Sequence, residues 1–118
     1  MDKRTKNITD HPFTEDKEIE WDIQSDTVKR KIMLYDDNMM LLKEAFRQVG
    51  IGEDHAPPHT QITYIADGVF EVEIDAKKKT LKTGDAFYVP SNSLHGVRCL
   101  EDGMLIDIFH PSREDFLL

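Results

Sequence analysis

Four side chains that could bind a metal ion occur in two short stretches of the chain: His55, His59, Gln61 and His95. Alternate residues of a strand point to the same face, so a regular strand through residues 55–63 would align the first three. His95 would complete the set from a separate strand. Neutral imidazole nitrogens and an amide oxygen suit Mn, Fe, Ni or Zn. We therefore expect these four residues to bind one divalent metal ion, whose identity the ligand types leave open.

The same histidines have a simpler explanation. Pro57 and Pro58 lie between His55 and His59, and proline pairs are typical of surface loops. Histidines in such a loop are commonly exposed residues with no ligand. Elemental analysis of protein purified without chelator separates the two interpretations.

Short apolar segments separated by turn residues must position these side chains. We expect strands over residues 29–35, 39–49, 61–65, 69–74, 80–82, 86–89, 96–100 and 104–109. Residues 39–45 also fit a helical period, but a strand is favoured because Asp36-Asp37-Asn38 is typical of a hairpin turn. Tight turns are expected at Ala66-Asp67-Gly68 and at residues 101–103. About eight short strands without a long helix predict an all-β antiparallel sandwich or barrel.

The composition is that of one soluble globular domain. The chain has 118 residues, a hydrophobic share of 39% and a net charge of −8. That charge, without a stripe of Lys and Arg, argues against nucleic-acid binding. No membrane-span or signal-peptide pattern is present, and the single Cys99 cannot form an internal disulfide, so a cytoplasmic protein is expected. Residues 1–28 are expected to form an N-terminal arm, packed on the barrel or on a partner subunit, and residues 29–118 the barrel domain.

Two motifs in this stretch resemble those of the cupin family. In the first, His55 is followed by Gln61 in the place of the family's acidic ligand, and six residues separate Gln61 from Gly68. The second motif is complete, with Gly84, Pro90 and His95 at the family's spacing. The resemblance implies a small double-stranded β-helix, a jelly-roll barrel with a metal site inside. Pro57 stands where the family has its second metal histidine, so a weakened site with His59 as the substitute ligand is expected.

The C-terminal run from Asp107 to Phe116 resembles the ending of the pectin-degradation cupins, Asp-x-Phe-x-Pro-x-Arg-x-Asp-Phe. Those cupins convert unsaturated uronates, the breakdown products of pectin or alginate, into open-chain keto sugar acids. The resemblance implies that Asp107 is the catalytic acid and base, that Phe109 packs against the sugar and that Arg113 holds its carboxylate. Alternatively, Asp107 is a polar residue at a strand end and Arg113 pairs with Glu114 or Asp115 at the surface.

The function expected from this resemblance is therefore metal-dependent ring opening of a small sugar acid. Two alternatives remain. One is a non-catalytic module that binds a sugar or a small acid, and the other is a metal-dependent dioxygenase, because imidazole and oxygen ligands with open positions also suit iron and O₂. Family members are commonly dimers, so a homodimer is expected.

Overall fold

The computed structural model describes residues 12–117 and shows an all-β protein. The sequence-based prediction of fold class is confirmed. The elements in chain order are η1 (Asp16–Glu18), β1 (Asp22–Ile23), β2 (Val28–Tyr35), β3 (Met40–Phe46), β4 (Ile51–His55), β5 (Thr60–Ile74), β6 (Lys77–Lys82), β7 (Ala86–Val89), β8 (His95–His110) and η2 (Glu114–Leu117). Among residues 12–117, no helix has the length and apolar composition that crossing a membrane requires.

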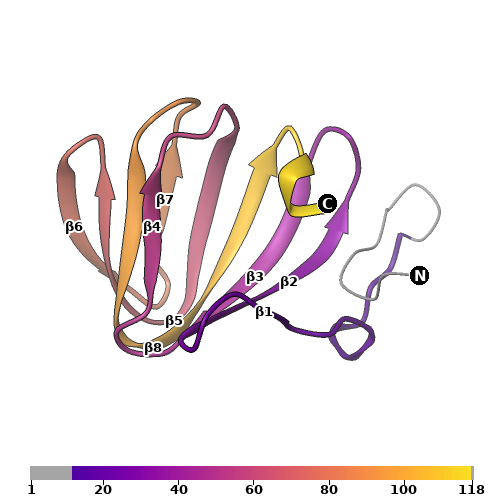
Figure 1. The fold of residues 1–118 in the computed structure, drawn as a ribbon, viewed down its shortest axis with the longest axis horizontal. Helices are drawn as coiled ribbons and strands as arrows, with labels where there is room; N and C mark the ends of the chain where they lie inside the picture. The colour runs from indigo at the N-terminus through magenta and orange to yellow at the C-terminus, as the bar shows by residue number, and fades with distance from the viewer. Residues whose placement is uncertain (1–11, 118) are drawn as a thin grey trace.

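Two long strands, β5 and β8, organise the barrel. They pair antiparallel along nearly their whole length, from Thr60 opposite His110 to Ile74 opposite His95. The C-terminal part of β8 also pairs with β3, and its N-terminal part with β4. The first part of β5 pairs with β7 and the second with β6. Because both long strands bend in the middle, their two halves rise on either side of the molecule and face each other (Figure 1).

The expected tight turns at residues 66–68 and 101–103 are wrong. Both segments lie inside continuous strands, β5 and β8, where the pairing register shifts between Ile65 and Phe70. Gly68 has a φ of 93°, and a Cβ there would lie 2.7 Å from the carbonyl oxygens of Glu101 and Asp102. Gly68 therefore allows two bent backbones to approach closely, a role that a turn signature resembles in sequence.

The segment before β2 is attached to the barrel. β1 pairs with the start of β2, and Ile19 is buried. The buried Lys31 ammonium forms an ion pair with Asp16, at 3.2 Å, and lies 4.8 Å from the centre of the Trp21 ring. Lys43, and then Lys31, lower the pKa of Asp16 through hydrogen bonds. Residues 1–11 of the expected N-terminal arm lie outside the described residues.

Two apolar clusters fill the barrel. The larger one is built around Phe46 and Phe70, whose rings meet edge to face at 5.2 Å. The smaller one contains Met40, Leu42 and Phe109, with Phe116 packed against it. Buried polar side chains replace apolar ones at inward positions of β5 and β8, so the interior has a polar site as well as a core.

Candidate active site

A cavity of about 430 Å³ opens into the barrel. Its wall carries both charged and apolar side chains from strands far apart in sequence. The apolar part of the wall includes Phe109 and Phe116. A cavity of this size accommodates a monosaccharide-sized ligand. The polar residues that matter below are Arg30, Glu44, His55, Gln61, His95, Asp107 and Arg113.

Asp107 is the most buried charged residue of the site, with 1% of its surface exposed. It lies opposite Thr63 in the pairing of β8 with β5. The Thr63 hydroxyl donates to Asp107 Oδ1 at 2.6 Å, and Gln61 Nε2 donates to the same oxygen at 3.3 Å. Asp107 Oδ2 is buried without a hydrogen-bond partner. The two neighbours thus orient the carboxyl group through its first oxygen, and the Glu44 side chain also lies close enough to interact with it.

The environment of Asp107 favours its protonated form. Burial raises the pKa of this carboxyl well above its usual range, and the nearby Glu44 carboxylate raises it further. The hydrogen bonds from Thr63 and Gln61 act in the opposite direction but do not reverse the shift. A protonated carboxylic acid in a cavity can act as a general acid.

Glu44 was not anticipated by the sequence analysis. It follows Met40 and Leu42 on the inward face of β3, a face that continues with Phe46. A charged residue at an inward position of an otherwise apolar alternation is the signal that could have identified it.

His55 and His95 come together in the structure. They are directly opposite in the pairing of β4 with β8, and their ring centres are 4.4 Å apart. His95 is buried, and its Nδ1 lies 3.2 Å from the Ser93 carbonyl oxygen. A proton on Nδ1 donated to that carbonyl leaves the lone pair on Nε2, the arrangement common in metal-binding histidines. Loss of hydration, followed by the nearby His95 and Arg113, lowers the pKa of His55, which favours a neutral imidazole.

Residues 55–63 do not form one regular strand, which was the condition for His55, His59 and Gln61 to share a face. β4 ends at His55 and β5 begins at Thr60, because the intervening prolines interrupt strand pairing. The loop is held by hydrogen bonds to its carbonyls, from the Asn92 amide to Pro57 at 2.8 Å and from the Ser91 hydroxyl to Pro58 at 2.5 Å.

This loop places His59 against a second hollow, which is formed with the segment from Pro111 to Asp115. His59 Nδ1 is buried without a hydrogen-bond partner. Burial, followed by the charge of Arg113, lowers the pKa of His59. His59 does not line the cavity that contains Gln61 and His95.

The donors of the main cavity fit a divalent ion with three neutral protein ligands. They are the imidazoles of His55 and His95 and the amide oxygen of Gln61, which is buried without a hydrogen-bond partner. Three protein ligands with open positions are typical of catalytic rather than structural metal sites. Within residues 12–117, no three His, Cys, Asp or Glu side chains are grouped closely enough to bind a metal without such an amide ligand.

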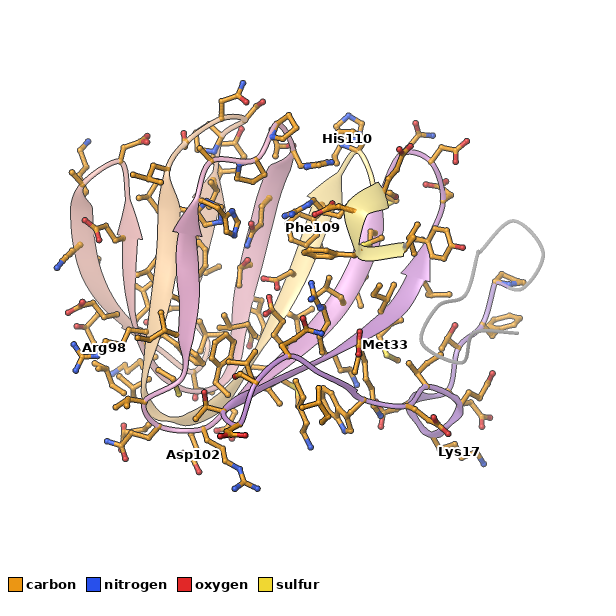
Figure 2. All side chains as sticks on the ribbon, viewed as in Figure 1. Lys17, Met33, Arg98, Asp102, Phe109 and His110 are labelled. Carbon is orange, nitrogen blue, oxygen red and sulfur yellow. The ribbon has the colours of Figure 1, made fainter. Side chains whose placement is uncertain are left out.

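Arg113 is buried and lines both the main cavity and the second hollow. Its Nε and Nη2 donate to the two carboxylate oxygens of Asp115, at 3.0 and 2.7 Å, while Nη1 is buried without a partner. Its guanidinium carbon lies 4.2 Å from the centre of the Phe116 ring and 5.3 Å from that of Phe109. Figure 2 shows Phe109 near the C-terminal end of β8, beside η2. Phe109 therefore supports Arg113 from within the core.

Comparisons of the sequence with protein families and with known proteins each find a match. The cupin domain family matches residues 46–109, a range that includes His55, Gln61, His95 and Asp107. The pectin degradation protein KdgF of Dickeya dadantii (strain 3937) is 45% identical over 104 residues, which cover 86% of this chain and 94% of that protein.

Solved structures with clear sequence similarity share the fold. KdgF from Halomonas sp. superposes with a TM-score of 0.85 at 35% identity, covering 88% of this chain and 96% of that chain. An RmlC-like cupin from Shewanella frigidimarina NCIMB 400 has a TM-score of 0.86 at 36% identity, covering 88% of this chain and 94% of that chain. The chain therefore belongs to the cupin family, in the group related to the pectin degradation protein KdgF.

Proposed function

We propose that this cupin binds a small unsaturated uronate and opens its ring to give a keto sugar acid. The observation that carries the proposal is Asp107, a buried carboxyl group whose second oxygen has no partner, in a cavity that also contains Arg113. Ring opening requires a protonated acid beside the substrate alkene, and binding of the substrate requires a cation beside its carboxylate. The similarity to a pectin degradation protein supports uronates as the substrate class, because pectin is a polymer of a uronic acid.

The chemical step is an isomerisation. The protonated Asp107 donates its proton to the alkene carbon β to the substrate carboxylate. The anomeric hydroxyl loses a proton, the bond between the anomeric carbon and the ring oxygen breaks, and that oxygen becomes the new ketone. The anionic Asp107 accepts a proton in exchange, so that no oxidant or water is consumed. Positioned proton transfer of this kind contributes roughly a hundred- to ten-thousand-fold in rate.

The surrounding residues orient this proton transfer. Thr63 and Gln61 hold Asp107 Oδ1 and direct Oδ2 away from themselves. Arg113 Nη1 supplies a donor for the substrate carboxylate, and Phe109 supports the guanidinium. A divalent ion held by His55, Gln61 and His95 would supply Lewis-acid polarisation of a substrate oxygen.

The activity test follows the absorbance of the substrate alkene. The native protein, Asp107→Asn and His95→Ala are compared with buffer, with dissolved oxygen recorded at the same time. We expect the native protein to remove the alkene without oxygen uptake and Asp107→Asn to be slower by about a hundredfold or more. No loss of absorbance with the native protein would exclude uronate ring opening, and oxygen uptake would indicate a dioxygenase.

One observation favours a binding module as the second candidate. Pro57 cannot ligate a metal, and His59 lines a neighbouring hollow, which shares His55 with the cavity, and not the cavity itself, so the ligand set of the cavity is small. In this case the protein would bind the sugar acid without turnover. Calorimetric titration with a uronate identifies such a module by binding that is measurable while the alkene absorbance stays constant.

The outer face of the sheet supports a homodimer as part of the proposal. Ile62 is directly opposite Tyr88 on β7 and Ile108 on β8, and all three side chains are exposed, by 52%, 56% and 38%. Tyr64, two residues further along β5, extends the same face. A contiguous exposed apolar patch of this kind is typical of a protein interface.

We place the protein in the cytoplasm because its single cysteine, Cys99, is buried and free.

A further inference from the structure

In this structure, the edge of the Arg113 guanidinium that binds a carboxylate most strongly is already occupied. A guanidinium binds a carboxylate most strongly when two parallel N–H groups face its two oxygens. Arg113 already uses such an edge, formed by Nε and Nη2, for Asp115. Nη1 remains without a partner. Nη1 and the second N–H of Nη2 are the donors that Arg113 retains for a ligand, so a second guanidinium beside it would strengthen the contact with both carboxylate oxygens.

Arg30 is placed to be this donor. It lies on β2 opposite Glu44 of β3, and both residues line the same cavity as Arg113. The guanidinium carbon of Arg30 is 3.9 Å from the centre of the Phe116 ring, and that of Arg113 is 4.2 Å from the same point. Two guanidinium groups therefore pack on one aromatic ring at the wall of the cavity.

Arg30 forms no direct ion pair with a carboxylate of the described residues, although Asp22 of β1 and Glu44 of β3 are its cross-strand neighbours. Its side-chain hydrogen bond goes from Nη2 to the neutral Gln24 Oε1, at 2.5 Å. Among residues 12–117, the structure has no ion pair between Arg30 and a carboxylate, including Glu44 on the facing strand. A guanidinium carries five N–H donors, so Arg30 retains donors for a ligand. Gln24, which also lines the cavity, orients it from the segment that follows β1.

We propose that Arg30 and Arg113 bind the carboxylate of the sugar acid together, each supplying one side of the contact. This inference rests on the proposed function and makes Arg30 a substrate-binding and specificity-determining residue. The ring of Phe116 holds the two guanidinium groups in place without neutralising them. The site consequently distinguishes a free acid from its ester, because the ester lacks the negative charge that Arg30, which has no direct ion pair among the described residues, would bind.

The experiment measures binding of D-galacturonate and of its methyl ester to the full-length protein by calorimetric titration. Arg30→Met removes the charge and keeps an unbranched apolar side chain next to Phe116. Arg98→Met is the matched control, because Arg98 is exposed on β8 and lies far from Phe109 in Figure 2. We expect Arg30→Met to weaken binding of the acid about ten- to a hundredfold, with binding of the ester unchanged. Arg98→Met should bind both as the native protein does.

Acid binding by Arg30→Met as tight as that of the native protein would overturn the inference, as would an equal loss for acid and ester. Thermal unfolding verifies that the variant is folded, and Arg30→Lys provides the second variant if it is not. The lysine retains the charge without the planar fork, so a smaller loss of acid binding is expected. Ring opening of the unsaturated uronate is assayed on the same samples. If Arg30→Met turns over the uronate with the native KM, the role of Arg30 is refuted but the proposed activity stands. If the native protein binds the acid and not the ester but does not turn the uronate over, the proposed activity is refuted but the role of Arg30 stands.

Discussion

Among single residues, Asp107 combines the features that a proton donor needs. It is buried, two neighbours hold one of its oxygens, and the other oxygen has no partner. Its raised pKa has a cost in stability, because the unfolded chain releases the proton more readily than the native protein does. The native state therefore contains a destabilising group that is useful only when a ligand is bound.

The cost can be measured through the pH dependence of stability. Between the unfolded pKa and the raised folded pKa of Asp107, the native state binds more protons, so stability falls as the pH rises. Asp107→Asn lacks this contribution. In chelator-treated protein, the variant should therefore gain stability relative to the native protein from about pH 4 upward, by at most about 1.4 kcal/mol per pH unit. Denaturant unfolding at several pH values measures the difference, and a difference independent of pH would contradict the raised pKa.

The histidines can be separated by metal binding. We expect Mn, Ni or Zn to raise the melting temperature of the native protein, by about 10 °C at an ion concentration a hundredfold above Kd. His95→Ala should lose this shift, because His95 faces His55 in the main cavity. His59→Ala should retain most of it, because His59 lines the other hollow. Equal losses in the two variants would show that the loop brings His59 to the metal.

Among the elements, the paired strands β5 and β8 determine the shape of the cavity. Their bends lie where the register shifts, and Gly68 sits at that point with the backbone of β8 against it. Gln61 lies in the first half of β5 and Asp107 in the paired second half of β8, whereas His95 lies at the start of β8. The bend makes these two parts of the sheet face each other. A straight pair of strands would place these side chains along one flat face.

Two glycines with nearly the same backbone angle test this role. Gly68 and Gly84 have φ values of 93° and 96°, but a Cβ added at Gly68 would meet backbone atoms at 2.7 Å, whereas one added at Gly84 would meet no atom within 4 Å. Gly84→Ala should cost about 1–2 kcal/mol, the conformational penalty alone. Gly68→Ala should cost clearly more, since the carbonyls of Glu101 and Asp102 must also move. Denaturant unfolding compares the two, and equal losses would mean that the close approach of the strands has no effect on stability.

At the level of the whole molecule, the outer face of the barrel is as informative as the cavity. Its exposed apolar side chains are cross-strand neighbours on β5, β7 and β8, so they form one surface and are not scattered. The opposite faces of the same strands carry Gln61, Thr63 and Asp107. A dimer through this surface would cover the outside of the strands that build the site and would stiffen them.

The dimer is tested by light scattering. Ile62→Asp places a charge at the centre of the patch and should convert a dimer into a monomer. Val49→Asp is the control, because Val49 is equally exposed, at 52%, but lies in the connection between β3 and β4. It should leave the mass unchanged. A native protein that is monomeric at micromolar concentration, or a dimer that survives Ile62→Asp, would contradict the proposed interface.

The pattern of neighbouring residues in the sequence was sufficient to predict the fold class and part of the site. Strand periodicity and turn residues predicted an all-β barrel, because alternation of side chains is a property of neighbouring residues. The same rule placed Asp107 and Phe109 on one face, and both are inward and buried. The turns at residues 66–68 and 101–103 were misassigned because glycine serves equally at a turn and at a close approach of two strands.

Contacts between distant strands were decided only by the tertiary structure. The pairing of β4 with β8 sets His95 against His55, whereas the proline loop places His59 in a neighbouring hollow that it shares with His55 but not with His95. The approach of Glu44 to Asp107 depends on the register between the neighbouring strands β3 and β8, and the packing of Arg30 and Arg113 on Phe116 depends on the position of η2. Sequence determined which residues could do chemistry, whereas register and strand bending determined which of them meet, because both follow from packing of the whole barrel.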